Sequence, residues 1–415
     1  MPSVCLYFQV HQPERLRRYS VFDATTNYFD PGKNAEILRK VAAKCYLPAT
    51  QVLLEQIERN DGAFRVAFSL TGTVIEQFQA YAPDVIDRFR KLAETGCVEF
   101  LAETYHHSLA GLYDRDEFEQ QVDLHSDLID RLFNQRPTVF RNTELIYNND
   151  VAQLAADLGF RGVVAEGADG PLNGRRPDMV YRPKGADISL LLKNYKLSDD
   201  IAFRFSNTAW EHHPLTAQKM AKWIHELGSC EEGTTPEPGP ASQRQAQVCN
   251  LFMDFETFGE HQWQETGIFG FLRKLPKAVL ENGDNFLVPT EVVDAYPADD
   301  EYDCPQMTSW ADSERDLSAW VGNAMQSSAL AELYRLGGIV KELGDDKLLS
   351  LWRRLTTSDH VYYMATKHEG DAAVHDYFSP YQSPYDGYIN FMNVLDNLRA
   401  RVEAAGVERE VSAEA

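Results

Sequence analysis

The sequence predicts an α/β fold, namely a β/α barrel of about seven strands followed by a C-terminal α-helical subdomain. Seven short apolar runs recur over the first 255 residues, and most are separated by segments with the periodicity of an amphipathic helix. This alternation is typical of a parallel sheet with helical crossovers. From about Ser309 onward the sequence instead predicts long amphipathic helices and no strands. Seven strands are many for an open, doubly wound sheet of this length, so the barrel is the favoured interpretation.

The predicted strands include near-continuously hydrophobic runs, as expected for strands that are covered on both faces. The run Ile188–Leu192 is an extra strand candidate outside the count of seven. The seven runs are Ser3–Val10, Phe64–Leu70, Cys97–Ala102, Thr138–Asn142, Arg161–Ala165, Asp200–Phe205 and Val248–Met253.

Helices are predicted between the strands and throughout the C-terminal part. The first of them, Ala35–Arg59, is expected to break at Pro48, which lacks a backbone N–H donor. The other segments of helical period are Val74–Leu92, Asp116–Phe133, Asp150–Leu158, Leu317–Leu343, Lys347–Thr366 and Tyr388–Ala405. We therefore expect a barrel over residues 1–305, a helical subdomain over 306–410, a frayed tail over 411–415 and a mobile surface loop at Gly228–Gln247.

The composition argues against several classes of function. The chain has 415 residues, with 40 Lys and Arg against 63 Asp and Glu, and its formal net charge is −23. Such a surface repels nucleic acid and anionic membranes, whereas a neutral substrate such as a sugar is not repelled. The six cysteines are scattered without a C-x-x-C pair, which indicates a reducing compartment. The sequence has no evident signal segment or long apolar stretch, so we expect a cytoplasmic location; the oligomeric state stays open.

Polar residues crowd the ends of four predicted strands. They form HQP at 11–13, ETYHHS at 103–108, NTE at 142–144 and DFETFGEHQW at 254–263. Because the strands of a parallel barrel all emerge on one face, these groups should converge there. Two acids, several hydroxyl-binding groups and aromatic rings on one rim suit a site that cleaves a glycan. Any one of these residues could instead be a cap or a surface charge, but four strand ends that behave alike favour a site.

Five segments resemble, in the correct order, the ordered sequence regions of glycoside hydrolase family 57, and especially its short α-amylase-like members. The resemblance implies an incomplete (β/α)7 TIM-like barrel followed by helices, and a retaining α-glucan enzyme that needs no metal. The segments are HQP at 11–13, GCVEFLAETYHHSL at 96–109, FRNTELIYNN at 140–149, FMDFETFGEHQ at 252–262 and SWADSERDLSAWVGN at 309–323.

The resemblance assigns the catalytic pair. It puts the family's nucleophile at Glu144 and its general acid/base at Asp254. In retaining enzymes the two carboxyl groups lie about 5–5.5 Å apart, and the first forms a covalent glycosyl ester. Asp254 must have a raised pKa to be protonated near neutral pH, and its apolar neighbours together with the charge of Glu144 should raise it.

The other candidates are substrate-binding residues, and each has a structural alternative. His11 and Gln12 bind sugar hydroxyls or form a turn, and only one of two adjacent histidines is expected to face the site. Glu256 and His261 position Asp254, or Glu256 is a solvated loop acid. Asp312 and Asp316 reach the rim, or they lie at a helix N-terminus, where the helix dipole stabilises an acid. Trp320 is a candidate for stacking on a sugar ring, and its alternative is burial in the core. The substrate-binding candidates are His11, Gln12, Glu103, His106, His107, Glu256, His261, Trp263, Trp310, Asp312 and Asp316.

The predicted function is a retaining α-1,4-glucan hydrolase of α-amylase type that acts on starch, glycogen or maltooligosaccharides. A 4-α-glucanotransferase with the same catalytic pair is the first alternative, and a catalytically weak glucan-binding protein is the second. The histidine pairs His106-His107 and His212-His213 invite a metal interpretation, but the sequence has no H-E-x-x-H motif. It also lacks a P-loop and a G-x-G-x-x-G motif, so we expect neither a metal nor a nucleotide cofactor.

Overall fold

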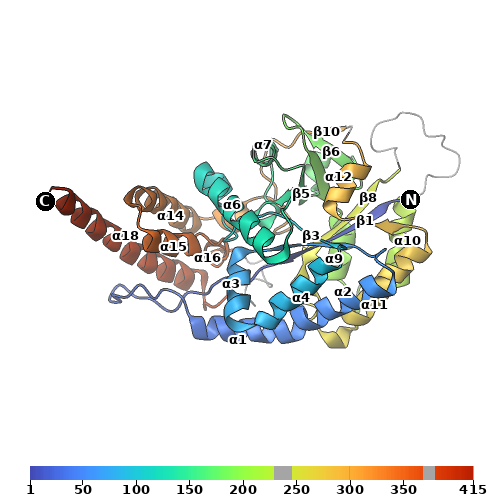
Figure 1. Cartoon of the computed structure of the whole chain (residues 1–415), viewed down its shortest axis with the longest axis horizontal. Coiled ribbons are helices and arrows are strands. Elements are labelled where there is room, and N and C mark those ends of the chain that lie inside the picture. The colour runs from blue at the N-terminus through green and yellow to red at the C-terminus, as the bar shows by residue number, and fades with distance from the viewer. Residues whose placement is uncertain (229–244, 299, 368–378, 415) are drawn as a thin grey trace.

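The strands of the computed structural model form two sheets, which lie side by side in Figure 1. The structure describes residues 1–228, 245–298, 300–367 and 379–414. In the first sheet the order is β3 (Val98–Phe100), β2 (Val66–Leu70), β1 (Ser3–Val10) and β8 (Val248–Asp254), and the short β9 (Asn285–Phe286) also pairs with β1. In the second the order is β10 (Asp300–Tyr302), β6 (Val180–Pro183), β7 (Ser189–Lys193), β5 (Gly162–Glu166) and β4 (Val139–Arg141).

All strand pairs are parallel except β6 with β7, which is antiparallel. The two sheets meet along two edges. On one side an isolated parallel bridge joins Ala102, beyond β3, to Phe140 of β4. On the other side the backbone N–H of Asn194, just after β7, donates to the carbonyl of Asn250 in β8 at 2.9 Å. The architecture is therefore α/β with mainly parallel strands in two sheets, which are joined at both edges by a few hydrogen bonds.

The predicted strand Asp200–Phe205 is wrong, because its first half ends helix α9 (Tyr195–Ala202) and its second half is a turn. The side chain of Asn194 accepts from the N–H of Leu197 and caps the helix. Beyond the helix, Arg204 donates to Asp200 at 2.6 Å, an i,i+4 contact typical of helical spacing. The strand at this point of the order is β7, which coincides with the extra candidate Ile188–Leu192.

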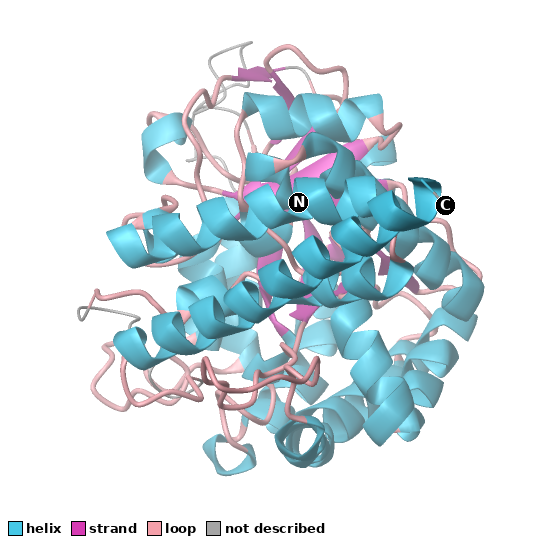
Figure 2. Cartoon of the chain, turned by 90° about the vertical axis from the view of Figure 1, so that its left-hand side faces the viewer, coloured by secondary structure: helices cyan, strands magenta, loops and turns pink. Residues whose placement is uncertain are grey.

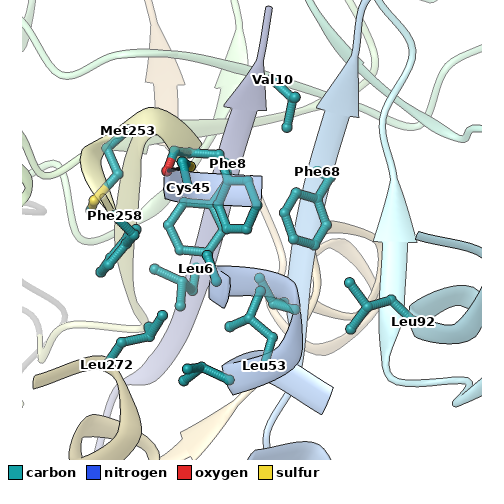
Figure 3. Close-up of a cluster of buried hydrophobic side chains, with 14 of the residues drawn as sticks. Leu6, Phe8, Val10, Cys45, Leu53, Phe68, Leu92, Met253, Phe258 and Leu272 are labelled. Atoms are coloured by element: carbon teal, nitrogen blue, oxygen red, sulfur yellow. Dashed lines mark hydrogen bonds between the residues drawn. The ribbon is translucent and has the colours of Figure 1, made fainter. Parts of the chain in front are cut away.

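Alternation along β1 explains where the core and the site lie. Val4, Leu6, Phe8 and Val10 point outward and pack under the surrounding helices, as Figure 3 shows for the last three. The intervening residues Cys5 and Tyr7 point inward, into a second apolar cluster between the sheets. Burying each large side chain contributes about 1.5–3 kcal/mol. Gln9 continues the inward series at the carboxyl end of the strand, where the interior becomes polar.

Helices pack around the sheets, with two local departures from prediction. The segment Ala35–Arg59 divides close to Pro48, which lies in the first turn of the second α-helix, but the π-helical turn Ala42–Tyr46 keeps the chain helical between the two. The predicted Val74–Leu92 is two helices, since Pro83 starts a new one. The helices before residue 305 are α1 (Pro31–Val41), α2 (Leu47–Arg59), α3 (Gly72–Tyr81), α4 (Pro83–Glu94), α5 (Ala110–Tyr113), α6 (Arg115–Phe133), α7 (Asn149–Asp157), α8 (Asp169–Leu172), α9, α10 (Ala217–Leu227), α11 (Ile268–Glu281) and α12 (Pro289–Ala295).

The C-terminal part is helical as predicted and gathers on one side of the molecule (Figures 1 and 2). Trp320 is 1% exposed there, which fits the core alternative. The predicted loop Gly228–Gln247 lies mostly outside the described residues. Residues 411–414 are not the frayed tail that the sequence predicts, because they belong to α18, which is helical to Glu414. The helices among the described residues of this part are α13 (Ser318–Val321), α14 (Ala324–Leu343), α15 (Asp346–Leu355), α16 (Asp359–Tyr362) and α18 (Pro384–Glu414).

Within the described ranges, no helix combines the length and the apolar character that crossing a bilayer requires.

Candidate active site

A cavity of about 240 Å³ opens at the carboxyl ends of β1, β4, β7 and β8. These strands end in or lead to polar residues that point into it, which is the arrangement expected of parallel strands. Nine of the predicted site residues line this cavity: His11, Gln12, His107, Glu144, Asp254, Glu256, His261, Trp310 and Asp312.

Glu144 follows β4 in a tight turn that has an unfavourable backbone conformation. Its φ is 56° and its ψ is 26°, the left-handed region that residues with a side chain rarely adopt. Asn142 holds the turn: its side-chain oxygen accepts from the N–H of Thr143 and its amide donates to the carbonyl of Ile146, both at 3.0 Å. Strain of this kind costs about 1–3 kcal/mol and is often found at active sites.

Two donors fix the carboxylate of Glu144. The Nε2–H of His107 donates to Oε1 at 2.9 Å, and the indole Nε1–H of Trp310 donates to Oε2 at 2.7 Å. Burial alone would raise the pKa of Glu144. The hydrogen bond and charge of His107, the charge of Arg141 and the hydrogen bond from Trp310 outweigh burial and hold this pKa below its ordinary value. Glu144 is therefore ionised near neutral pH.

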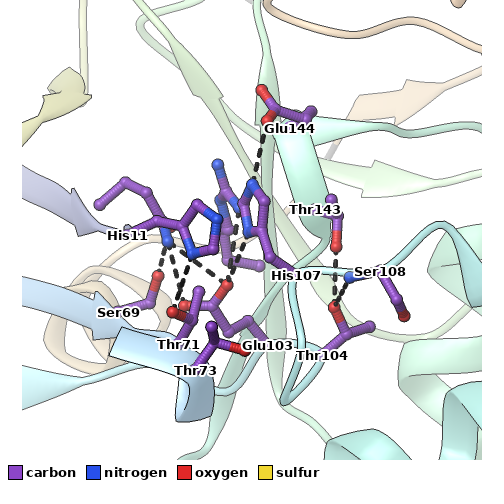
Figure 4. A network of polar contacts seen from close by, with 12 residues as sticks. His11, Ser69, Thr71, Thr73, Glu103, Thr104, His107, Ser108, Thr143 and Glu144 are labelled. Atoms are coloured by element: carbon purple, nitrogen blue, oxygen red, sulfur yellow. Dashed lines mark hydrogen bonds and ion pairs between the residues drawn. The ribbon is translucent and has the colours of Figure 1, made fainter. Parts of the chain in front are cut away.

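His107 lies between two carboxylates, as Figure 4 shows. Its Nδ1 is 3.3 Å from Oε2 of Glu103, while its Nε2 contacts Glu144. Burial would lower the pKa of His107, but the hydrogen bonds to the two carboxylates raise it to about 9. The imidazole is thus a cation with both N–H groups engaged. Glu103 itself is fully buried and accepts from Gln9 at 3.1 Å, so it fixes the orientation of His107.

Asp254 is the last residue of β8 and lies beside Gln9 of β1 in the strand register. Burial, and then the charge of Glu144, raise the pKa of Asp254 to about 6, although Arg141, Lys193 and His107 oppose this rise. One cavity therefore holds an ionised carboxylate and a carboxyl group that retains its proton to higher pH. Two acids whose pKa values are separated by their surroundings suit different tasks: the ionised one can act as a nucleophile, and the protonated one can donate a proton.

Glu256 lies two residues beyond Asp254 and is only 5% exposed, so it is not the solvated loop acid considered above. The hydroxyl of Tyr46 donates to its Oε1. Burial and the charge of Asp254 both raise the pKa of Glu256. Glu256 therefore holds its own proton more readily than a solvated glutamate does.

His11 connects the cavity to the C-terminal helices. Its Nδ1 is 2.9 Å from the hydroxyl of Thr71, and its Nε2 is 3.0 Å from Oδ2 of Asp359, the first residue of α16. The rings of His11 and His107 stack at a centroid distance of 4.1 Å. Burial, and then the charge of His107, lower the pKa of His11. One wall of the cavity is thus supplied by residues almost 350 positions apart.

The chain matches one sequence family over most of its length: residues 5–305 fit the model of Glycosyl hydrolase family 57. The chain belongs to this family. A Methanocaldococcus jannaschii protein named "Putative alpha-amylase" is 41% identical over 404 residues, which cover 94% of this chain and 82% of that protein.

Two solved structures illustrate the fold that this family 57 glycoside hydrolase shares. A branching enzyme from Pyrococcus horikoshii superposes with a TM-score of 0.69 at 15% identity, over 95% of this chain and 88% of that one. A 4-alpha-glucanotransferase from Thermococcus litoralis gives a TM-score of 0.58 at 17% identity, over 94% of this chain. This chain spans 55% of the length of the glucanotransferase.

Four predicted site residues of this family 57 member lie outside the cavity lining. His106 points instead toward Thr73, whose hydroxyl is 3.1 Å from its Nδ1, so His107 is the histidine that faces the cavity. Glu103 lies behind His107. Asp316 accepts from the backbone N–H of Ser318 at 2.8 Å, which fits the helix N-terminal alternative. Trp263 is 58% exposed, on the loop just beyond the cavity.

Sequence reasoning missed four charged residues at or beside the cavity of this glycoside hydrolase. Arg141 precedes the NTE segment, but it belongs to a strand and carries no strand-end signal. Lys193 follows the extra strand candidate by one position, and Asp199 directly precedes the predicted strand Asp200–Phe205. Asp359 lies in a predicted helix, where nothing in the local pattern distinguishes it from a surface acid.

Proposed function

We propose that this family 57 chain is a retaining α-1,4-glucan hydrolase of α-amylase type, with Glu144 as nucleophile and Asp254 as general acid/base. The observation that carries the proposal is the pair of acids with opposite pKa shifts in one cavity. The identity to a relative whose name includes alpha-amylase supports the substrate class. Starch, glycogen and maltooligosaccharides are neutral, so the net charge of −23 does not repel them.

In the first step the Glu144 carboxylate attacks the anomeric carbon and the glycosidic C–O bond breaks. The proton of Asp254 passes to the leaving oxygen, and a covalent glycosyl ester of Glu144 forms. In the second step the Asp254 carboxylate takes a proton from water, whose oxygen attacks the anomeric carbon. The ester bond breaks, Glu144 leaves as a carboxylate, and Asp254 is protonated again.

We infer substrate-binding roles for the residues around this pair. His11, Gln12, His261 and Asp312 present polar groups to the cavity, where they would bind sugar hydroxyls. Trp310 donates its N–H to Glu144, so we assign it to the carboxylate as well as to the cavity wall. Trp263, whose ring is exposed just beyond the cavity, would stack on a sugar outside it.

The proposal extends to the architecture. We infer that the two sheets are parts of an incomplete (β/α)7 TIM-like barrel over residues 1–305, and that the helical subdomain over 306–410 completes the rim. The strand order, with hydrogen bonds between the sheets at both meeting edges, supports the barrel. Trp310 and Asp359 support the contribution of the helical part. A reducing, cytoplasmic location is supported by five described cysteines that are buried and unpaired.

A 4-α-glucanotransferase is the second candidate, because the same ester could react with a sugar hydroxyl in place of water. Two solved structures with the same fold are a glucanotransferase and a branching enzyme. Incubation with maltoheptaose, followed by chromatography of the products, separates the candidates. Glucose and short maltodextrins alone mean hydrolysis, and longer products mean transfer. Unchanged maltoheptaose would refute both and leave a binding protein.

A further inference from the structure

Four charged side chains form a compact cluster behind one wall of the cavity; we call Glu166, Lys193, Asp199 and Arg315 the ion cluster. Nζ of Lys193 lies 3.4 Å from Oε2 of Glu166 and 3.3 Å from Oδ1 of Asp199. The guanidinium of Arg315 lies 3.2 Å from the same Glu166 oxygen and 3.6 Å from Oδ2 of Asp199. Each cation thus bridges both anions, and the cluster has no net charge.

The ion cluster joins four separate pieces of the chain. Glu166 ends β5, Lys193 ends β7, Asp199 lies in α9, and Arg315 belongs to the turn at residues 309–316. Lys193 and Asp199 also line the cavity, whereas Glu166 and Arg315 do not. Glu166 is fully buried, and the Arg315 side chain is 17% exposed. Because Arg315 does not line the cavity, its effect on the reaction must pass through other residues.

The turn at 309–316 needs such support. Asp312 and Arg315 have φ values of 56° and 51°, in the left-handed region that residues with a side chain rarely adopt. Within the turn, the N–H of Ser309 donates to the carbonyl of Arg315 at 3.0 Å. The guanidinium of Arg315 also lies over the ring of Tyr195, 3.9 Å from its centroid. Arg315 therefore anchors the far end of the turn to α9 and β5.

The near end of the turn carries Trp310, which holds the nucleophile. Its indole N–H donates to Oε2 of Glu144, and its backbone N–H donates to the Glu144 carbonyl at 3.2 Å. Nζ of Lys193, a member of the ion cluster, lies 5.3 Å from the centroid of the Trp310 ring. The cluster thus reaches Trp310 twice, through the backbone of the turn and through the face of the ring.

We propose that Arg315 is a positioning residue, which ties the 309–316 turn to the ion cluster and so holds Trp310 on the carboxylate of Glu144. This role rests on the proposed function, because it presumes that Glu144 attacks the substrate. The competing explanation is that Arg315 only balances the buried charge of Glu166. The two explanations differ in what happens when that charge balance is restored without Arg315.

The kinetic test compares Arg315→Met with the double variant Glu166→Gln/Arg315→Met, in the full chain with maltoheptaose. The single variant leaves two anions and one cation, so it lowers the Tm; the double variant is neutral and should recover the Tm. If Arg315 positions Trp310, kcat falls at least tenfold in both variants, and KM changes less than threefold. Recovery of kcat together with the Tm in the double variant would overturn the proposal.

The pH profile gives a second readout. Glu144 is faced by His107, Arg141, Asp254 and the Trp310 indole. Loss of the Trp310 hydrogen bond removes one stabilisation of the ionised form, so the acid limb of kcat/KM should move to higher pH in both variants. An unmoved acid limb would count against the proposal. Arg315→Lys keeps the charge without the bidentate fork, and it should retain the Tm and lose part of kcat.

Fluorescence tests the positioning step without substrate. The contribution of Trp310 is obtained by subtracting the emission spectrum of the Trp310→Phe counterpart from that of each protein. This difference spectrum should change in emission and in quenching by acrylamide when Arg315 is replaced, and an unchanged spectrum would overturn the proposal. Arg353→Met is the matched control, since Arg353 pairs with buried Glu117 at 2.8 Å and this pair is not part of the ion cluster. The control should lower the Tm and leave kcat and the Trp310 spectrum unchanged. A wild-type protein inactive on maltoheptaose would refute the proposed function, while the fluorescence result would still decide the role of Arg315.

Discussion

Replacing His107 by Gln tests the electrostatics of the site most directly. Gln keeps an N–H donor of similar reach but removes the positive charge beside Glu144. A hydrogen bond to a charged group contributes about 1.5–3 kcal/mol, and at 1.36 kcal/mol per factor of ten this predicts a loss in kcat of about ten- to 150-fold. The structure favours the upper half of that range, because the His107 side chain is 3% exposed and water screens its charge little.

The same variant should shift the whole pH profile of kcat/KM upward. The acid limb reports Glu144, which must be ionised, and the alkaline limb reports Asp254, which must be protonated. His107 lowers the pKa of both groups, so its removal raises both pKa values. Arg141 and Lys193 remain beside Asp254 and limit its shift. Both limbs should therefore move to higher pH, and the acid limb should move further because only Glu144 is hydrogen-bonded to His107.

The assay is initial-rate hydrolysis of maltoheptaose over a range of pH, with Tm measured at each point. His106→Gln is the control, because His106 is the adjacent buried imidazole but contacts Thr73 and does not line the cavity. It should leave both limbs in place. A His107→Gln protein with a wild-type profile and less than a threefold loss in kcat would refute the electrostatic role assigned to His107.

Three further changes test the rest of the site. Glu144→Gln should lower kcat by several orders of magnitude with an unchanged Tm, since it removes the covalent step and keeps the shape; more than a tenth of wild-type activity would exclude Glu144 as nucleophile. Activity should survive dialysis against EDTA, because two carboxylates suffice for the chemistry, and a loss reversed only by zinc or calcium would contradict this. Truncation after residue 305 should give aggregated, inactive protein, as it exposes the apolar surface under α14 and removes Trp310 and Asp359; a soluble, active fragment would contradict the rim assignment.

Strand runs and strand-end residues could be predicted from the sequence because both are local. β1 is buried along its whole length and β8 up to Met253, so both strands are mostly apolar before the polar residues at their carboxyl ends. The segment at Asp200–Phe205 was misassigned because a short apolar pattern fits a strand and a helix equally. What distinguishes the helix is the capping side chain of Asn194, six residues before the start of the predicted strand.

Contacts between distant segments could not be predicted, because nothing local encodes them. The pKa of His107 depends on Glu103 and Glu144, and the adjacent His106 has the same chemistry but faces Thr73. The difference arises from the backbone: His107 has a φ of 54°, which turns its side chain away from that of its neighbour. Sequence patterns thus identify the polar groups of this site, whereas the backbone conformation of the turns determines which of these groups contact one another.

The protonation states of the two acids in the site depend on which segments of the chain supply the acids and which supply the cations and hydrogen-bond donors. Strand ends bring acids together, and an unsupported cluster of buried carboxylates would be too costly to ionise. The groups that keep Glu144 ionised come from elsewhere. Two are cations, His107 from the turn after β3 and Arg141 from the end of β4, and the third is the neutral donor Trp310, from the segment that leads into the C-terminal helices. Among the residues that the structure describes, no cation donates a hydrogen bond to Asp254, which keeps its proton to higher pH. The asymmetry between two chemically similar acids, on which a retaining mechanism depends, is therefore set by which of them the distant donors reach.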